Sequence, residues 1–264
     1  MYTVFIRKSS LFIQCIISIL LLLNSHSILA KETSDDTKPV TEKSEVDKVA
    51  EKGKSSKKKN PENFEVKITA DIPFLDVNHQ GEVVRIQRNQ DTHYKMTNSF
   101  AKTSRKCPPF CIRPIKLSED IQTVGELELL EFLQNEVRTE TGLLIDARLK
   151  DWHVKGTIPG SISIPFTMFT GGFEDYNTVS LLELLGAEEG DEEIGAKEEE
   201  QEKWIFDDVV KLMLFCNGPW CGQSPKAIKA LLKLGYPAEK ILWYRGGMQA
   251  WQSFGLTIVK PKSQ

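Results

Sequence analysis

The chain has 264 residues, of which 40% are hydrophobic and 27% are charged, a composition typical of a globular protein. Its 34 basic and 37 acidic side chains give a formal net charge of −3, so the basic excess of a protein that mainly binds nucleic acid is missing. With only 17 glycines, 12 prolines and one long apolar run, the chain is neither collagen-like nor a multi-span membrane protein.

The long apolar run is Leu11–Leu23, which follows Arg7 and Lys8 and precedes a short segment that ends at Ala30. A charged start, an apolar core and a small-residue end are typical of a secretory signal, so residues 1–30 are predicted to direct export to a periplasmic or other extracytoplasmic compartment. The alternative is an uncleaved anchor in the inner membrane, with residues 5–23 as the tether. The apolar run is shorter than the roughly 20 residues that span a bilayer, which favours cleavage.

Residues 31–62 carry nine basic and eight acidic side chains and almost no apolar ones, which predicts a disordered charged linker. Residues 63–119 are predicted to form a small β-rich N-terminal extension. Its strands are expected at 64–68, 73–77 and 82–86, the last two joined by a turn that contains glycine. The rest of the extension, from 91 to 115, shows no periodicity.

Residues 120–264 alternate between helical and strand patterns, which predicts an α/β domain whose parallel sheet is flanked by helices. The stretch Thr123–Glu126 resembles a capping box in front of a helix that runs to Val137. An insertion at 186–203, with nine acidic and two basic side chains, is expected to be a solvated loop before a helix at Phe206. Strands are expected at 143–147, 162–165, 211–216 and 241–244, and helices at 179–185, 205–210, 225–234 and 247–253.

In such sheets the ligand site lies beyond the carboxyl ends of the strands, and Cys216 stands at one of these ends. Ser224 and Pro225 are expected to cap and open the next helix. Loop N–H groups and the helix dipole would then lower the pKa of the Cys216 thiol and make it a nucleophile. The alternative is an inert buried cysteine. The predicted active-site loop contains Asn217, Gly218, Pro219, Trp220, Gly222, Gln223 and Ser224.

Four motifs in this part of the chain resemble the rhodanese-like family, from about residue 120 to 260. They are LLIDAR at 143–148, GTIPGSISIP at 156–165, Cys216 itself and YRGGMQAW at 244–251. The resemblance implies a sulfurtransferase in which Cys216 takes sulfur from a small donor as a persulfide and yields it to a thiol or another nucleophilic acceptor. It implies no cofactor, and no nucleotide, flavin or haem motif is present. No protein partner can be identified.

The sequence departs from the family in the active-site loop, where seven residues rather than four or five separate Cys216 from Ser224. None of the seven is basic, so the loop lacks a fixed charge for a dianionic donor. Arg245 is the best candidate for that charge, and Asp146 and Arg148 are weaker candidates for substrate contacts. The lone arginine that phosphatases of this fold place at the loop's end is also missing, since Gln223 stands there.

Four further cysteine and histidine positions leave alternatives open. Cys221 could resolve or oxidise Cys216, or could only pack in the loop. Cys107 and Cys111 could form a structural disulfide, remain free thiols, or supply half of a metal site with the other two cysteines, although the spacing does not favour metal and none is predicted. His153 is expected on a surface turn.

Two other functions therefore stand beside sulfur transfer. One is thiol–disulfide exchange through Cys216 and Cys221, and the other is a catalytically silent interaction module with the same fold.

Overall fold

A computed structural model describes residues 64–190 and 204–261 of the chain. The predicted signal peptide or tether, the charged linker up to residue 62 and residues 191–203 of the acidic insertion lie outside these ranges. Within the described residues, no helix has the length and apolar character needed to cross a membrane.

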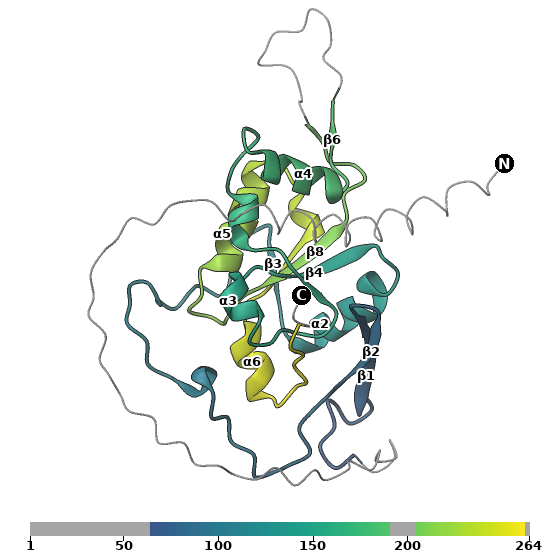
Figure 1. Cartoon of the computed structure of the whole chain (residues 1–264), viewed down its shortest axis with the longest axis vertical. Helices are drawn as coiled ribbons and strands as arrows, with labels where there is room; N and C mark the ends of the chain where they lie inside the picture. The colour runs from purple at the N-terminus through teal and green to yellow at the C-terminus, as the bar shows by residue number, and fades with distance from the viewer. Residues whose placement is uncertain (1–63, 191–203, 262–264) are drawn as a thin grey trace, which may run out of the picture. The chain divides into compact units, whose positions relative to one another are not determined.

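The centre of the fold is a five-stranded sheet in which every strand is parallel to its neighbours (Figure 1). Helices flank this sheet, so the predicted α/β class is confirmed. Four of the strands agree with the pattern in the sequence. The fifth, at one edge, was not predicted because two of its three residues were interpreted as part of the cap of the next helix. In spatial order the strands are β3 (Gln122–Val124), β9 (Ile241–Tyr244), β8 (Lys211–Phe215), β4 (Gly142–Asp146) and β5 (Ser161–Ser163).

Successive residues of β9 show how the two faces of the sheet are covered, because side chains alternate along a strand. Tyr244 points to the face of helix α2, where its hydroxyl donates to Glu126 at 2.8 Å. Trp243 points to the opposite face, where its indole N–H donates to Ser224 of helix α5 at 3.2 Å.

The helices are α2 (Glu126–Phe132) with a π-helical continuation η3 (Leu133–Val137), α3 (Lys150–His153), α4 (Tyr176–Leu184), α5 (Gln223–Lys233) and α6 (Gly247–Ser253), with short 3₁₀ turns η2 (Ser99–Ala101), η4 (Phe166–Phe169) and η5 (Ala238–Lys240).

The N-terminal extension contributes one antiparallel hairpin, β1 (Phe74–His79) and β2 (Glu82–Gln87). Its inward side chains join the same buried cluster as α2 and α6, so the hairpin packs on the domain. The predicted strand at 64–68 is wrong. The side-chain amide of Gln90 bonds both the N–H and the carbonyl of Val66, at 3.2 and 2.7 Å, and so occupies the groups that a neighbouring strand would pair.

The predicted helix at 205–210 is also wrong. Trp204–Ile205 forms a strand, β7, that pairs antiparallel with β6 (Glu188–Glu189) at the base of the acidic insertion. The chain after it is irregular, and the N–H of Val210 bonds the carbonyl of Leu185 rather than a helical partner. Of the apolar residues that suggested a helix, Val209 is buried, Phe206 and Val210 are partly buried, and Ile205 is 42% exposed, so they do not form one buried helical face.

The expected cap of α2 is displaced by two residues. The helix begins after Gly125, whose N–H donates to the Glu128 carboxylate at 3.0 Å. Thr123 lies in β3, and its hydroxyl donates to the carbonyl of Ile115 at 2.6 Å. Only the Glu128 half of a capping box is therefore present, because the glycine at the cap position has no side chain that could accept the N–H of Glu128.

A buried ion pair joins the carboxyl end of β4 to the turn that follows. Asp146 and Arg148 are 0% and 1% exposed, and two guanidinium nitrogens of Arg148 bond the two carboxylate oxygens at 2.7 and 2.6 Å. His153 Nδ1 lies 3.0 Å from the same carboxylate and Thr157 donates to it at 2.8 Å. Burial raises the pKa of the Asp146 carboxyl, but the hydrogen bonds from Arg148 and His153 outweigh this effect and hold the pKa below its usual value.

This network corrects the surface position predicted for His153, which is 8% exposed. A short helix, α3, turns the imidazole inward toward Asp146, a contact that no local pattern in the sequence indicates.

We expect Asp146→Ala to lower the free energy of unfolding by about 3–5 kcal/mol, because it leaves the buried Arg148 without a counter-charge. The chain contains a matched control in the exposed pair of Asp76 and Arg85, which also makes two bonds, each of 2.8 Å. Asp76→Ala should cost only about 0–1 kcal/mol. Urea unfolding of both variants tests this, and equal losses would contradict a structural role for the buried pair.

Candidate functional site

Cys216 lies directly after β8, at the carboxyl edge of the sheet, and begins the active-site loop (residues 216–224) that leads into α5. Backbone hydrogen bonds from the start of α6, the helix that follows the neighbouring strand β9, fix the position of Cys216. The N–H groups of Met248 and Gln249 donate to the carbonyls of Cys216 and Asn217, both at 3.0 Å. This close approach requires glycine at 247, where φ is +54° and a Cβ atom would collide with the Cys216 carbonyl.

Hydrogen-bond donors converge on the Cys216 sulfur, which is buried. The Ser224 hydroxyl donates to Sγ at 3.1 Å, and further bonds come from the Cys221 thiol and the N–H groups of Gly218 and Ser224. Since Ser224 Oγ accepts from the Trp243 indole, its own proton is directed to the sulfur. Burial raises the pKa of Cys216, but these donors outweigh burial and lower the pKa to about 7.

The Cys221 thiol is a proton donor with two neighbouring acceptors, the Cys216 sulfur and the side-chain oxygen of Gln223, which lies 3.8 Å from its sulfur. Its hydrogen bond to the Cys216 sulfur and its burial both raise the pKa of the Cys221 thiol far above the usual value. A turn closed by the bond from the Cys221 N–H to the Gly218 carbonyl, at 2.9 Å, brings the residue back toward the strand end. Both cysteines are free thiols in the structure.

The structure changes the role predicted for Ser224. Gly222 occupies the cap position and α5 begins at Gln223, so Ser224 and Pro225 lie inside the first turn and are buried. The serine is thereby released from capping the helix and serves as a donor to sulfur. Sequence reasoning missed this role because capping is a local pattern, whereas the contact joins positions eight residues apart.

The other candidate charges near the loop are engaged. Arg245 donates to the carbonyls of Arg113 and Pro114, at 2.6 and 2.9 Å, which corrects its proposed role as the free charge of the site. Arg148 and Asp146 satisfy one another, and Arg148 also donates to the Asn217 side chain at 3.4 Å. This arrangement makes them supports of the loop.

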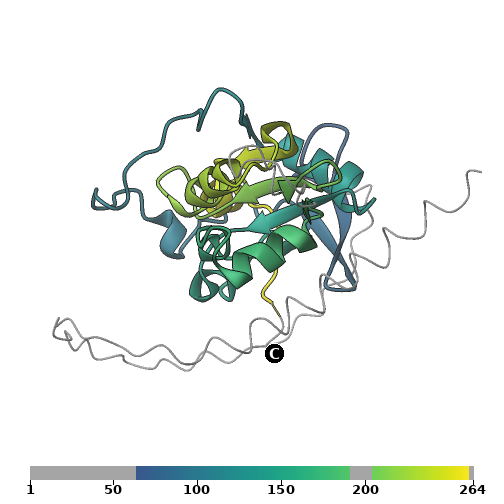
Figure 2. The ribbon, with the colours of Figure 1, turned by 90° about the horizontal axis from the view of Figure 1, so that it is seen from above.

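A segment that the sequence did not connect with the site lies against the loop. The stretch between β2 and β3 runs outside the sheet and helices (Figure 2), and we call its residues 102–115 the strap. The strap N–H of Arg113 donates to the Pro219 carbonyl at 2.8 Å. Trp220 lies between Phe110, with ring centroids 5.4 Å apart, and Arg105, whose guanidinium is 4.0 Å from the ring centroid.

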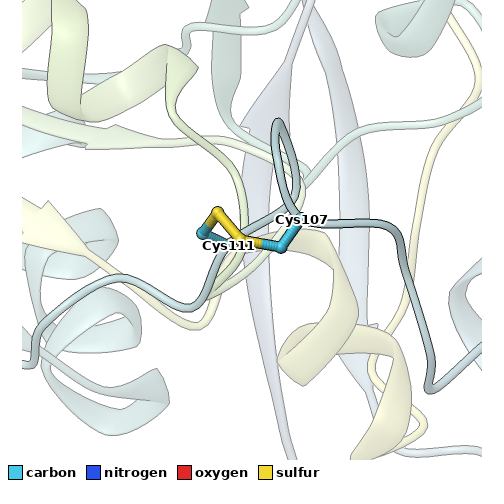
Figure 3. The surroundings of a disulfide bond; sticks show 2 residues. All are labelled: Cys107 and Cys111. Atoms are coloured by element: carbon cyan, nitrogen blue, oxygen red, sulfur yellow. A yellow bond between two sulfur atoms is a disulfide. The ribbon is translucent and has the colours of Figure 1, made fainter.

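Within the strap, a disulfide joins Cys107 to Cys111, whose Cα atoms are 4.7 Å apart (Figure 3). These two cysteines are therefore not paired with the loop cysteines. In residues 64–190 and 204–261, no group of three or more histidine, cysteine or acidic side chains is placed to hold a metal ion.

Comparisons with known structures give several chains of similar fold. A rhodanese-related protein from Thermoplasma volcanium is 18% identical, with a TM-score of 0.33, over 53% of this chain and 99% of its own. A human single-domain sulfurtransferase is 22% identical, with a TM-score of 0.33, over 50% of this chain and 95% of its own. A thiosulfate sulfurtransferase from Pseudomonas aeruginosa is 17% identical, with a TM-score of 0.34, over 55% of this chain and 21% of its own.

The comparison with curated proteins gives no match. The sequence model of the rhodanese-like domain matches residues 128–254, a range that includes β4, the active-site loop and α6. The chain therefore contains a rhodanese-like domain at residues 128–254.

Proposed function

We propose that the chain is an exported sulfurtransferase that carries sulfane sulfur as a persulfide on Cys216. The observation that supports this most is the set of donors around Cys216 Sγ, which lowers the pKa of a buried thiol to about 7. With that pKa about half of the thiol is ionised at neutral pH, and the thiolate is the nucleophilic form.

The reaction has two steps. With thiosulfate as donor, the Cys216 thiolate attacks the outer sulfur, the sulfur–sulfur bond of the donor breaks, and sulfite leaves with the bonding electron pair. A nucleophilic acceptor such as cyanide or a thiolate then attacks the outer sulfur of the persulfide and releases the Cys216 thiolate. The donors at Gly218, Cys221 and Ser224 stabilise the anionic sulfur in both resting and loaded forms.

Export rests on the pattern of residues 1–30 and gains support from the Cys107–Cys111 disulfide, because disulfides persist in oxidising compartments. A periplasmic or other extracytoplasmic location follows, with residues 5–23 as the tether if the signal is retained.

Incubation of the full chain with thiosulfate should add one sulfur atom, seen by intact mass, and cyanide should remove it as thiocyanate. Cys216→Ser should abolish both events because the nucleophile is gone. Cys221→Ser is the matched control, since it removes the neighbouring thiol and keeps a hydroxyl donor, and it should still accept one sulfur. A wild-type chain that gains no sulfur, or a Cys221→Ser chain that gains none, would contradict the assignment.

The thiolate of Cys216 should appear with a midpoint near pH 7. Ser224→Ala removes one bond to the charged sulfur, worth roughly 1.5 kcal/mol, and should move the midpoint up by about one pH unit. The measurement is the ultraviolet absorbance of the thiolate against pH, with Cys216→Ser subtracted as the blank. An unchanged midpoint in Ser224→Ala would show that the hydroxyl does not stabilise the anion.

Thiol–disulfide exchange remains a second candidate because the Cys221 thiol donates to the Cys216 sulfur. Reversible oxidation would join the two sulfurs, with two electrons passing to a disulfide substrate. Reaction with a small disulfide such as oxidised glutathione, followed by mass analysis, distinguishes the two. A mass decrease of two hydrogen atoms that requires both Cys216 and Cys221 would support thiol–disulfide exchange. No change in mass with either thiosulfate or oxidised glutathione would support a catalytically silent module.

A further inference from the structure

The strap is basic and lies against a loop that has no charge of its own. Residues 102–115 include four basic side chains and no acidic one, whereas residues 217–223 include none of either sign. The strap meets the loop through the backbone bond from Arg113 to Pro219 and through the contacts of Arg105 and Phe110 with Trp220. Positive charge is thus brought to the loop from a segment about 100 residues earlier in the chain.

Arg113 is the strap residue whose charge lies at the loop itself. A methyl group built on Gly222 would be 2.7 Å from Nη2 of Arg113, so the guanidinium lies directly over this glycine. Gly222 stands between Cys221 and Ser224, both of which contact the Cys216 sulfur. The guanidinium therefore lies along the same part of the loop that holds the reactive sulfur.

The charge of Arg113 is uncompensated within the part of the chain that the structure describes. Its side chain makes no hydrogen bond or ion pair with any described residue, and its Nε is buried without a partner. A half-buried guanidinium is normally paired, because its five N–H groups form a planar fork that fits an oxyanion. The arginine is also held in place, since its carbonyl accepts from Arg245 and the nearby disulfide restricts the strap.

We propose that Arg113 forms an anion-binding subsite beside Cys216, which binds the oxyanion end of a small sulfane-sulfur donor such as thiosulfate. This inference rests on the proposed sulfur transfer for its substrate, but the subsite itself is a property of the strap and the loop. Arg113 acts on binding of the donor, and the Cys216 thiolate performs the transfer described above.

Alkylation of Cys216 tests the subsite without sulfur transfer. Iodoacetate and iodoacetamide have the same reacting carbon, and each forms a carbon–sulfur bond as iodide leaves, but only iodoacetate carries a carboxylate. We expect Arg113→Gln to lower the rate ratio of iodoacetate to iodoacetamide by about tenfold, because a charge-assisted bond is lost. Lys106→Gln is the matched control, since it removes the same charge from an exposed strap position and should leave the ratio within about twofold.

A second variant keeps the arginine in the chain. Gly222→Ala is allowed by the local backbone, where φ is −103°, but its methyl group must displace the guanidinium. The ratio should fall in this variant as well. Peptide fragmentation assigns each alkyl group to Cys216 or Cys221, and circular dichroism verifies folding.

An unchanged ratio in folded Arg113→Gln or Gly222→Ala overturns the subsite, and so does an equal fall in Lys106→Gln. The outcome is separable from the proposed function. If the ratio falls but the wild type takes no sulfur from thiosulfate, the subsite stands and sulfur transfer fails. If sulfur is transferred and Arg113→Gln changes neither the ratio nor KM for thiosulfate, sulfur transfer stands and the subsite fails.

Discussion

The structure around the active-site loop depends on keeping one sulfur anion inside the protein. Burial disfavours a charged form, and a thiol at 3% exposure without donors would remain protonated. Donors at Gly218, Cys221 and Ser224 together reverse that preference. Their convergence needs three separate elements, because β8 carries the cysteine, α5 carries the serine, and β9 supplies the indole of Trp243 that orients its hydroxyl.

The charges near the loop are divided between support and recognition. Arg148 is neutralised by Asp146, so its bond to Asn217 positions the loop without adding net charge. The side chain of Arg245 donates hydrogen bonds to two strap carbonyls and so holds the strap in place beside the loop. Among these three arginines, only Arg113 has a side chain without a hydrogen-bond or ion-pair partner in the described residues. Two arginines thus hold the scaffold, and the third is available to a ligand.

The sequence predicts those features that local pattern determines. The apolar runs of β4, β8 and β9 and the position of Cys216 at a strand end follow from periodicity and from the family motifs. Contacts between distant segments have no such signature, so the bond from Ser224 to sulfur and the bonds of Arg245 to the strap were missed. One sequence signal could have pointed to the strap. It carries four basic residues and no acidic one, while the active-site loop lacks the basic residue that an anionic donor would need.

The strap contacts the part of the active-site loop that makes the loop long. A loop with seven residues between Cys216 and Ser224 extends to Trp220, and an exposed indole there would be unfavourable without cover. Phe110 and Arg105 supply that cover on two sides, and Gln249 accepts from the indole N–H at 2.6 Å. Cys216, in the same loop, is itself only 3% exposed. For the sulfur transfer that we propose, a nearly buried sulfur calls for a small donor, and a basic strap beside the loop favours one that is negatively charged.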